Sequence, residues 1–348
     1  MSIVVDMEKD LGAFHLGVKF EAGPGTLALL GVSGCGKSMT LKCIAGIERP
    51  DRGRIVVDGV TLFDAEKKID LPPQKRGAGL LFQNYALFPN MTVEQNICAG
   101  ARWEPDKKAR RRAAADLMAR FGLLDLAEHY PHQLSGGQQQ RTALARILVS
   151  KPRILLLDEP FSALDSHLRF RMEGEVRQVI QEFGGTVLLV SHDRDEVFRM
   201  ADRIAVMENG SIQTMGDKGT VFAAPRTVSA AALTGCKNLS PAAKLDEDHI
   251  KALDWGVTLR TVPPLEGVTA VGLRMHDVRL GPGEVNSFRC RVAEEIENPF
   301  SWTLMLLPLG VECAVPIGCE VEKEVWQARR AAEVEVHIPP EAILRLKD

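Results

Sequence analysis

The sequence lacks any marked excess of charge of one sign. Its 348 residues include 43 Lys and Arg against 46 Asp and Glu, which gives a formal net charge of −3. This balance disfavours non-specific binding to polyanions, so we expect no nucleic-acid partner.

Long apolar runs are also missing. The most apolar window, residues 301–318, is interrupted by Pro308, Gly310 and Glu312, whereas a helix that spans a bilayer needs ~20 mostly apolar residues. Residues 1–10 carry acidic side chains and no apolar core, unlike a secretion signal. We expect a cytosolic chain whose membrane role would come through a partner.

Cysteine pairs of the kind that bind zinc or form a disulfide framework are absent too. The seven cysteines are an odd number and include no Cys-x-x-Cys pair. We therefore expect reduced thiols.

What the sequence does contain is a set of short, continuous apolar runs. Residues 26–31, 153–160 and 185–193 are of this type, and helix-prone stretches separate them. Runs that do not alternate with polar residues are typical of parallel strands covered on both faces. Between about residues 85 and 150 such runs fade and Ala, Arg, Leu and Gln dominate. The pattern predicts an α/β domain with a helical insert.

Beyond a linker near residues 225–241 the apolar pattern changes. Stretches such as residues 268–280 and 332–338 alternate apolar and polar side chains and are separated by Pro and Gly. Such strands predict a small all-β domain, a barrel or a sandwich. We predict the α/β domain over residues 1–235 and the β domain over residues 241–348.

A glycine-rich loop joins the first apolar run to a helix-prone stretch. GVSGCGKS, residues 31–38, fits the pattern Gly-x4-Gly-Lys-Ser between a strand and a helix. Its backbone N–H groups suit phosphate oxygens, Lys37 can reach the outer phosphates, and Ser38 can ligate Mg²⁺. The predicted phosphate site contains Gly31, Ser33, Gly34, Cys35, Gly36, Lys37, Ser38 and Met39. We expect alkylation of Cys35 to block nucleotide binding.

Polar side chains follow the other apolar runs. Asp158 and Glu159 end one run, His192 ends the next along the chain, and Gln83 follows a third. The carboxyl ends of parallel strands meet at one edge of a sheet, where ligands bind. We predict that Asp158 holds Mg²⁺ and that Glu159 polarises the attacking water. His192 either contacts the γ-phosphate or has a structural role, and Gln83 can orient Mg²⁺ or water.

A second run of hydroxyl and glycine residues, LSGGQ at 134–138, precedes another helix-prone stretch. Ser135, Gly136 and Gly137 offer a hydroxyl, free N–H groups and the positive end of a helix, all suited to phosphate. Because the chain already has one phosphate loop, this second helix start would be useful if it completed the site of a neighbouring copy. The alternative is an N-cap serine without a ligand.

Taken in order, GVSGCGKS, Gln83, LSGGQ, ILLLDEP, SALD and His192 resemble the nucleotide-binding subunits of ABC transporters over about residues 1–235. The resemblance implies ATP and Mg²⁺ as ligands. It also implies a head-to-tail homodimer, in which each ATP lies between the glycine loop of one copy and the LSGGQ of the other. In this family Glu159 would be the general base, and Gln83 would couple the site to membrane subunits.

The same resemblance assigns roles to residues that the pattern alone leaves open. Ser135, Gly136, Gly137 and Gln138 would act across the dimer, and Asp165 would connect the two sites. An aromatic residue upstream of the glycine loop stacks on adenine in this family. Phe14 is the candidate here, with His15 as its competitor.

Residues 62–97 resemble the importer branch of the family, where the segment after Gln83 receives a helix of the membrane subunit. The stretch LFDAEKKID is similar to molybdate importers, while sulfate, ferric iron, polyamine and sugar importers share much of the rest. The resemblance implies a peripheral ATPase at the cytoplasmic face of the membrane, with integral permease subunits and, indirectly, a solute-binding protein as partners. Molybdate is the expected solute. A soluble, non-transport ABC ATPase is the alternative class, but its long coiled coils or second nucleotide domain are absent from this sequence.

The last domain resembles the small regulatory barrel, of the TOBE/MOP type, attached to such importer ATPases. A related barrel in molybdate importers binds an oxyanion, and a dimerisation module without a ligand is the alternative. Arg274, His276 and Ser287 are the polar candidates, and the sequence gives them no common geometry.

Overall fold

The computed structural model describes residues 2–101, 103–162, 166–312 and 315–347. The chain divides into two compact units, Met1–Lys218 and Gly219–Asp348. This boundary precedes residue 235, the predicted end of the first domain. The cause is helix α9 (Val228–Leu233), which packs on β15 (Ala270–Leu273) and β21 (Leu344–Leu346) of the second unit. The functional limits of the two domains stay a prediction.

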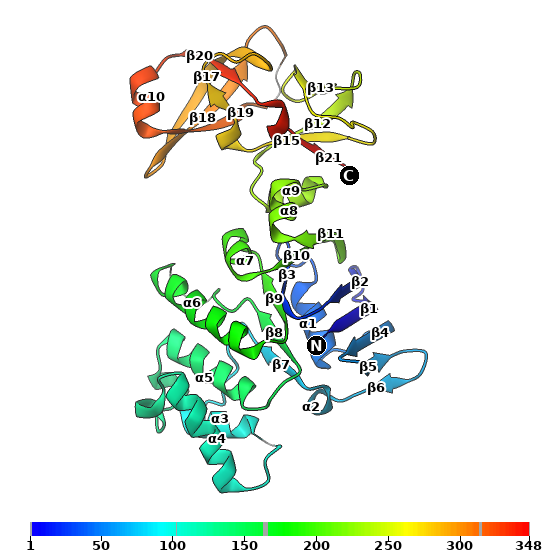
Figure 1. Ribbon diagram of the computed structural model, residues 1–348, viewed down its shortest axis with the longest axis vertical. Coiled ribbons are helices and arrows are strands. Elements are labelled where there is room, and N and C mark those ends of the chain that lie inside the picture. The colour runs from blue at the N-terminus through cyan, green and yellow to red at the C-terminus, as the bar shows by residue number, and fades with distance from the viewer. Residues whose placement is uncertain (1, 102, 163–165, 313–314, 348) are drawn as a thin grey trace. The chain divides into compact units, whose positions relative to one another are not determined.

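The centre of the first unit is a six-stranded sheet of order β11-β10-β3-β9-β8-β7 (Figure 1). Its strands are β3 (Gly25–Leu30), β7 (Ala78–Leu81), β8 (Ile154–Asp158), β9 (Thr186–Ser191), β10 (Arg203–Glu208) and β11 (Ser211–Asp217). All neighbours are parallel except β10 and β11. Every residue of β8 and β9 is buried, as the continuous apolar runs predict.

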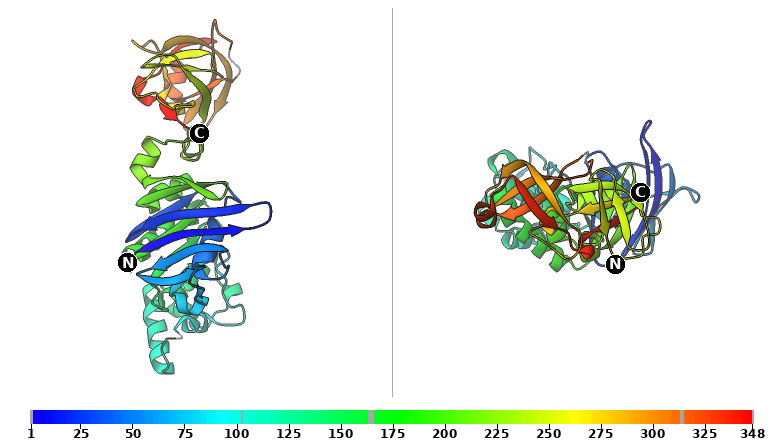
Figure 2. Two further views of the ribbon diagram at one scale, coloured as in Figure 1. Left: turned by 90° about the vertical axis from the view of Figure 1, so that its right-hand side faces the viewer. Right: turned by 90° about the horizontal axis from the view of Figure 1, so that it is seen from above.

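A second sheet of the first unit is antiparallel and has the order β2-β1-β4-β5-β6. Its strands are β1 (Ile3–Asp10), β2 (His15–Ala22), β4 (Arg52–Val57), β5 (Val60–Asp64) and β6 (Ile69–Asp70). In Figure 2 the hairpin of β1 and β2 is the long blue ribbon. Helix α1 (Lys37–Ala45) shares one core with both sheets, through residues such as Val5, Leu41 and Leu156. Because α1 is packed between the sheets, the loop at its start is held firmly.

Helices cover the first unit and form its insert. The larger ones are α3 (Val93–Gly100), α4 (Lys107–Arg120), α5 (Gly136–Leu148), α6 (Ser166–Phe183) and α7 (Arg194–Met200). The short ones are α2 (Pro73–Arg76), η1 (Leu124–Leu126) and η2 (Pro131–Gln133), while α8 (Lys218–Ala223) begins at the boundary and continues into the second unit. Helices α3, α4 and α5 form the helical insert, and α5 contacts β7 at the edge of the parallel sheet. Within the described part of the chain, no helix has the length and apolar character needed to cross a bilayer.

The second unit is built from two five-stranded antiparallel sheets of order β14-β13-β12-β15-β21 and β16-β20-β17-β18-β19. Its further strands are β12 (Asn238–Lys244), β13 (His249–Ala252), β14 (Val257–Arg260), β16 (Arg279–Leu280), β17 (Ser287–Glu297), β18 (Ser301–Pro308), β19 (Ile317–Glu322) and β20 (Glu333–His337), and its other helices are η3 (Met275–Asp277), α10 (Lys323–Arg329) and η4 (Pro340–Ala342). Side chains of both sheets share one core with Trp255, which lies between β13 and β14, and Trp326 of α10. The predicted fold class, an α/β domain with a helical insert followed by a small barrel-like β domain, is confirmed.

Candidate functional site

The glycine loop between β3 and α1 is shaped by backbone conformations that favour glycine. Gly34 and Gly36 have φ angles of 83° and 104°, in the left-handed region. A Cβ on Gly36 would lie 2.6 Å from Leu16 Cδ1, so a larger residue does not fit there. Gly36 also caps α1, whose free N–H groups and positive end face the loop. The loop therefore suits phosphate oxygens.

Lys37 places a positive charge inside this loop. Its side chain is buried, and Nζ donates to the carbonyl oxygens of Gly31 at 2.7 Å and Val32 at 2.8 Å. None of the described carboxylates forms an ion pair with the Lys37 ammonium. Its partners among the described residues are neutral, the two carbonyls and the Cys35 sulfur at 3.8 Å, so the charge is available to an anionic ligand.

Cys35 points away from the space that a ligand could fill. Its side chain is 3% exposed, and its Sγ would lie 2.6 Å from a Cβ built on Gly31. The thiol is packed beneath the loop, where a reagent has little access to it. The expectation that alkylation of Cys35 blocks nucleotide binding stays a prediction.

Ser38 and Asp158 bring two oxygen ligands together at the carboxyl edge of the parallel sheet. Asp158 ends β8, next to β9 and one strand away from β3. Ser38 Oγ donates to Asp158 Oδ1 at 2.7 Å. Burial raises the pKa of Asp158 and the Glu159 charge adds to the rise, whereas the hydrogen bond from Ser38 lowers it. A bound cation would offset the cost of this buried charge, and oxygen ligands suit Mg²⁺.

Glu159 and His192 meet at the same edge. His192 Nδ1 lies 3.1 Å from Glu159 Oε1, and the Glu159 side chain is 17% exposed. The Glu159 φ angle is 44°, and its N–H donates to the carbonyl of Val190 at 3.0 Å. Left-handed backbone at a residue other than glycine costs about 1 kcal/mol or more and is typical of functional sites.

Many of the predicted residues line one cavity of about 290 Å³. Its walls are Leu11, Phe14, Ser33, Gly34, Gly36, Lys37, Ser38, Met39, Lys42 and Glu159. Leu11 and Lys42 were not predicted, although Lys42 lies one helical turn beyond Ser38 on α1. Phe14 lines the cavity. His15 does not, and its Nδ1 instead shares a hydrogen bond with Asp10 Oδ1 at 2.6 Å. The adenine-stacking role of Phe14 stays a prediction.

Several predicted residues are not among those that line this cavity, and Gln83 is one of them. Gln83 follows β7, the neighbour of β8, but its side chain is exposed and forms no hydrogen bond to Ser38 or Asp158. Asp165, the residue expected to connect two sites, lies outside the described residues.

Residues 15–162 match the sequence profile described as ABC transporter. The spermidine/putrescine import ATP-binding protein PotA of Bacillus cereus is 41% identical over 237 residues, which are 68% of this chain and 70% of PotA. The chain belongs to the ABC transporter ATP-binding proteins. The putrescine transport ATP-binding protein PotG of Escherichia coli is 44% identical over 215 residues, 61% of this chain and 55% of PotG. A dimeric structure of the ATP-binding cassette MJ0796 bound to ADP and Pi has 27% identity and a TM-score of 0.52, covering 63% of this chain and 99% of that cassette.

The LSGGQ segment of this ABC protein starts α5 with a capping box. Ser135 Oγ accepts from the Gln138 N–H at 3.4 Å, and Gln138 Oε1 accepts from the Ser135 N–H at 2.8 Å. Within the described part of the chain, the N–H groups of Gly136 and Gly137 have no acceptor. None of these residues lines the cavity around Lys37. The segment thus offers free donors that its own glycine loop does not use.

Arg76 is a buried residue of the ATP-binding unit that no sequence motif singled out. Its side chain is 1% exposed, and Nη1 donates to the carbonyl oxygens of Cys43 at 2.7 Å and Ile44 at 3.1 Å. Nη2 donates to Asp70 Oδ1 at 2.8 Å. Arg76 therefore satisfies the C-terminal carbonyls of α1, the helix that begins at the glycine loop. A local motif could not reveal this contact across more than thirty residues of chain.

The polar candidates of the second unit have separate partners. Arg274 donates to the backbone carbonyls of Thr234, at 2.8 Å, and Phe222. Ser287 Oγ donates to Glu335 Oε1 at 3.2 Å, and His276 is exposed. Arg274 therefore attaches the segment before β12 to the rest of the second unit. The three candidates do not form a shared oxyanion site.

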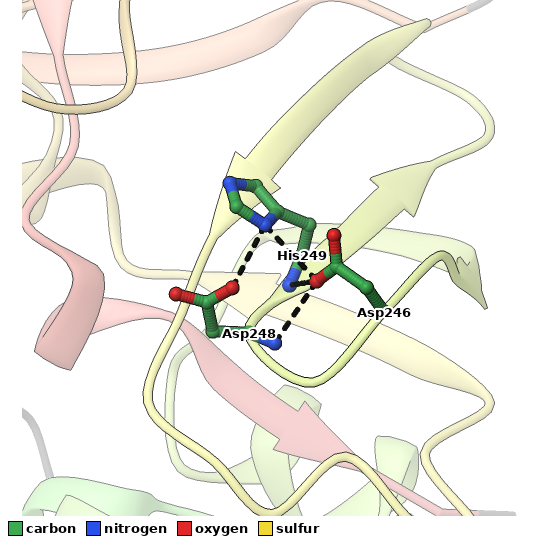
Figure 3. Close-up of side chains that lie close together, drawn as sticks. All are labelled: Asp246, Asp248 and His249. Carbon is green, nitrogen blue, oxygen red and sulfur yellow. Dashed lines mark hydrogen bonds and ion pairs between the residues drawn. The ribbon is translucent and has the colours of Figure 1, made fainter.

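A cluster of Asp246, Asp248 and His249 in the second unit was not predicted either. His249 Nδ1 lies 3.0 Å from Asp246 Oδ1 and 2.8 Å from Asp248 Oδ1 (Figure 3). Arg260 Nε also donates to Asp248 Oδ2 at 2.8 Å. Because these carboxylates have partners in the protein itself, we assign no metal to the cluster.

Proposed function

We propose that this chain is the ATP-hydrolysing subunit of an ABC importer and that two copies bind ATP between them. The observation that carries the proposal is the single cavity that joins the buried Lys37 ammonium, the Ser38 hydroxyl and the Glu159 carboxylate. A phosphate binder, a metal ligand and a base are the groups that hydrolysis of a phosphoanhydride needs.

Each residue of the cavity has a chemical task in this proposal. Lys37 and the N–H groups of the glycine loop bind the outer phosphates, and Phe14 stacks on adenine. Ser38 and Asp158 hold Mg²⁺, with Gln83 reaching it when the site closes. The ion neutralises charge on the phosphates when it is bound. Glu159 accepts a proton from the attacking water, while His192 orients Glu159 and contacts the γ-phosphate.

The second copy supplies donors that the first lacks. The N–H groups of Gly136 and Gly137, at the positive end of α5, suit the phosphates of ATP bound to the other copy. Ser135 and Gln138 keep this helix start in shape, and Asp165 would connect the two sites. The dimeric ADP-bound cassette MJ0796 supports this arrangement.

The importer role implies partners that this chain does not contain. Integral permease subunits would receive the motion of the dimer, and a solute-binding protein would act on them from the other side. The ATPase would then be a peripheral protein at the cytoplasmic face of the membrane. The relatives PotA and PotG, named for import and transport, support this assignment.

For the solute we propose a polyamine of the spermidine and putrescine class. The names of PotA and PotG support this choice at 41% and 44% identity, and they do not support the molybdate that the stretch 62–70 suggested. Transport into proteoliposomes that hold the complete importer would decide between them. Uptake of labelled spermidine or putrescine driven by ATP is expected, and uptake of molybdate alone would reverse the proposal.

The hydrolytic role is tested by Glu159→Gln. This variant removes the base but keeps the shape of the side chain, so it is expected to bind ATP and to dimerise while turnover falls about 100-fold or more. Glu182→Gln, at the end of α6 and outside the cavity, is the matched control. ATPase rate and gel filtration with ATP give the answer, and unchanged turnover in Glu159→Gln would remove Glu159 from the role of base.

A further inference from the structure

The helical insert holds the turn that carries Gln83 in place. Strand β7 ends at Leu81, and the parallel sheet makes no ladder contact beyond it. Arg146, in the last turn of α5, donates from Nη2 to the Tyr85 carbonyl at 2.9 Å and from Nη1 to the Ala86 carbonyl at 2.8 Å. The chain thus passes from the sheet to the insert within the few residues that include Gln83.

The two carbonyls that Arg146 binds belong to strained residues. Tyr85 and Ala86 have φ angles of 58° and 42°. Left-handed backbone at two successive residues other than glycine costs about 1 kcal/mol or more each, so it persists only where other contacts impose it. The planar guanidinium, with its fixed fork of donors, holds both carbonyls at once. The Phe88 ring lies 5.2 Å from the same guanidinium.

The segment after this turn is also bound to the insert. Asn96 of α3 is fully buried, its Oδ1 accepts from the Phe88 N–H at 2.8 Å, and its Nδ2 donates to the carbonyls of Phe88, Met91 and Thr92. The end of α5 is fixed to the segment after α3 by Trp103 Nε1, which donates to the Val149 carbonyl at 2.7 Å. Residues 85–92 are therefore attached to the helical insert and are expected to move with it.

Arg146 has no acid partner that could replace the two carbonyls. Among the described residues no carboxylate forms an ion pair with it, and burial lowers the pKa of its guanidinium. Arg146 is half-buried, and its charge-assisted hydrogen bonds to the carbonyls of Tyr85 and Ala86 are stronger than bonds between neutral groups. This makes the link between α5 and the turn stiff.

We propose that Arg146 is a positioning residue that makes the Gln83 turn follow helix α5. The same helix begins at Ser135 and carries LSGGQ, so one rigid element joins LSGGQ to Gln83. A displacement of α5 when LSGGQ meets ATP of a second copy is passed through Arg146 to Tyr85 and Ala86, and so to Gln83. This inference rests on the proposed function for the task of Gln83.

Arg146→Lys tests the inference because lysine keeps the charge but lacks the fork. We expect kcat for ATP to fall about tenfold while KM for ATP changes less than about twofold, since a misplaced group lowers turnover more than binding. The Mg²⁺ concentration for half-maximal activity is expected to rise. Arg141→Lys is the matched control, since Arg141 lies on the same helix and donates to the Phe121 carbonyl, away from the turn.

A double-mutant cycle separates positioning from a general loss of structure. In a Gln83→Ala background, Arg146→Lys is expected to cause less than about a twofold further loss, because both changes act on one step. Equal losses in both backgrounds, the same loss in Arg141→Lys, or normal turnover in Gln83→Ala would overturn the proposal.

Hydrogen exchange gives a readout that does not depend on hydrolysis. The amides of Tyr85 and Ala86 donate to the carbonyls of Phe82 and Asn84 within the turn. In Arg146→Lys they are expected to exchange about tenfold faster, with amides of β8 unchanged. Unchanged exchange would refute the role of Arg146 in holding the turn. Faster exchange in a protein without ATPase activity would refute the proposed function alone.

Discussion

The buried carboxyl group of Glu196 allows a quantitative test of how burial shifts a pKa and lowers stability. It lies in the first turn of α7, its side chain is 3% exposed, and its Oε1 has no hydrogen-bond partner among the described residues. Burial raises the pKa of Glu196 to about 8, and the charges of Asp193 and Glu173 add to the rise. The hydrogen bond from Ser191 and the charge of Arg169 act in the opposite direction.

The sign of the effect on stability follows from proton binding. Glu196 has an ordinary pKa of 4.5 in the unfolded chain and about 8 in the folded one. Between these values the folded protein keeps a proton that the unfolded chain has released, so the free energy of unfolding falls as pH rises. At 1.36 kcal/mol for each pH unit, the penalty is about 2 kcal/mol at ~pH 6 and at most about 5 kcal/mol above ~pH 8.

Glu196→Gln removes this penalty, since the amide has a similar shape and no charge. We expect the free energy of unfolding of the variant, relative to the parent, to increase by about 3 kcal/mol between ~pH 6 and ~pH 9. Urea unfolding followed by circular dichroism at helical wavelengths measures it. Glu182→Gln, with a side chain that is 37% exposed, controls for loss of one negative charge. A relative stability that does not depend on pH would refute the reasoning.

Three further changes probe other parts of the chain. Phe14→Ala is expected to weaken ATP binding about tenfold in a fluorescence titration, whereas His15→Ala leaves the affinity unchanged; equal losses would reject Phe14 as the stacking residue. Gly36→Ala is expected to lower ATP affinity at least tenfold, because its Cβ would lie 2.6 Å from Leu16. Trp255→Ala, at a fully buried position, should destabilise the second unit by about 3–5 kcal/mol in calorimetry and leave ATP affinity unchanged.

The parts of the site that the sequence predicts are those made by neighbours in the chain. The glycine loop, Lys37 and Ser38 form one local unit, and Asp158 is brought to it because parallel strands end at one edge. Contacts between residues far apart in the chain could not be predicted from the sequence. Nothing near Arg146 indicates that its side chain meets Tyr85, and nothing near Glu196 indicates its burial, because both depend on how helices pack on the sheet.

The molybdate expectation rested on a local resemblance that the names of PotA and PotG do not support. It relied on the stretch LFDAEKKID, which the structure folds into β5, a turn and β6 at the edge of the antiparallel sheet. This hairpin contributes no residue to the cavity around Lys37. A surface hairpin can vary in length without any effect on the transported solute, so the stretch carries little information about it.

The cavity and the start of α5 are complementary halves of one proposed site. A phosphate held at Lys37 would be covered by the glycine loop, while LSGGQ of the same chain contributes no wall to the cavity. Among the described residues, the N–H groups of Gly136 and Gly137 have no acceptor, and they lie at the positive end of a helix, which favours an anion. In the proposed dimer, these donors of one copy would meet the phosphate held at Lys37 of the other copy. The proposed two-fold dimer would complete both sites at once, because each copy would supply the donors that the other lacks.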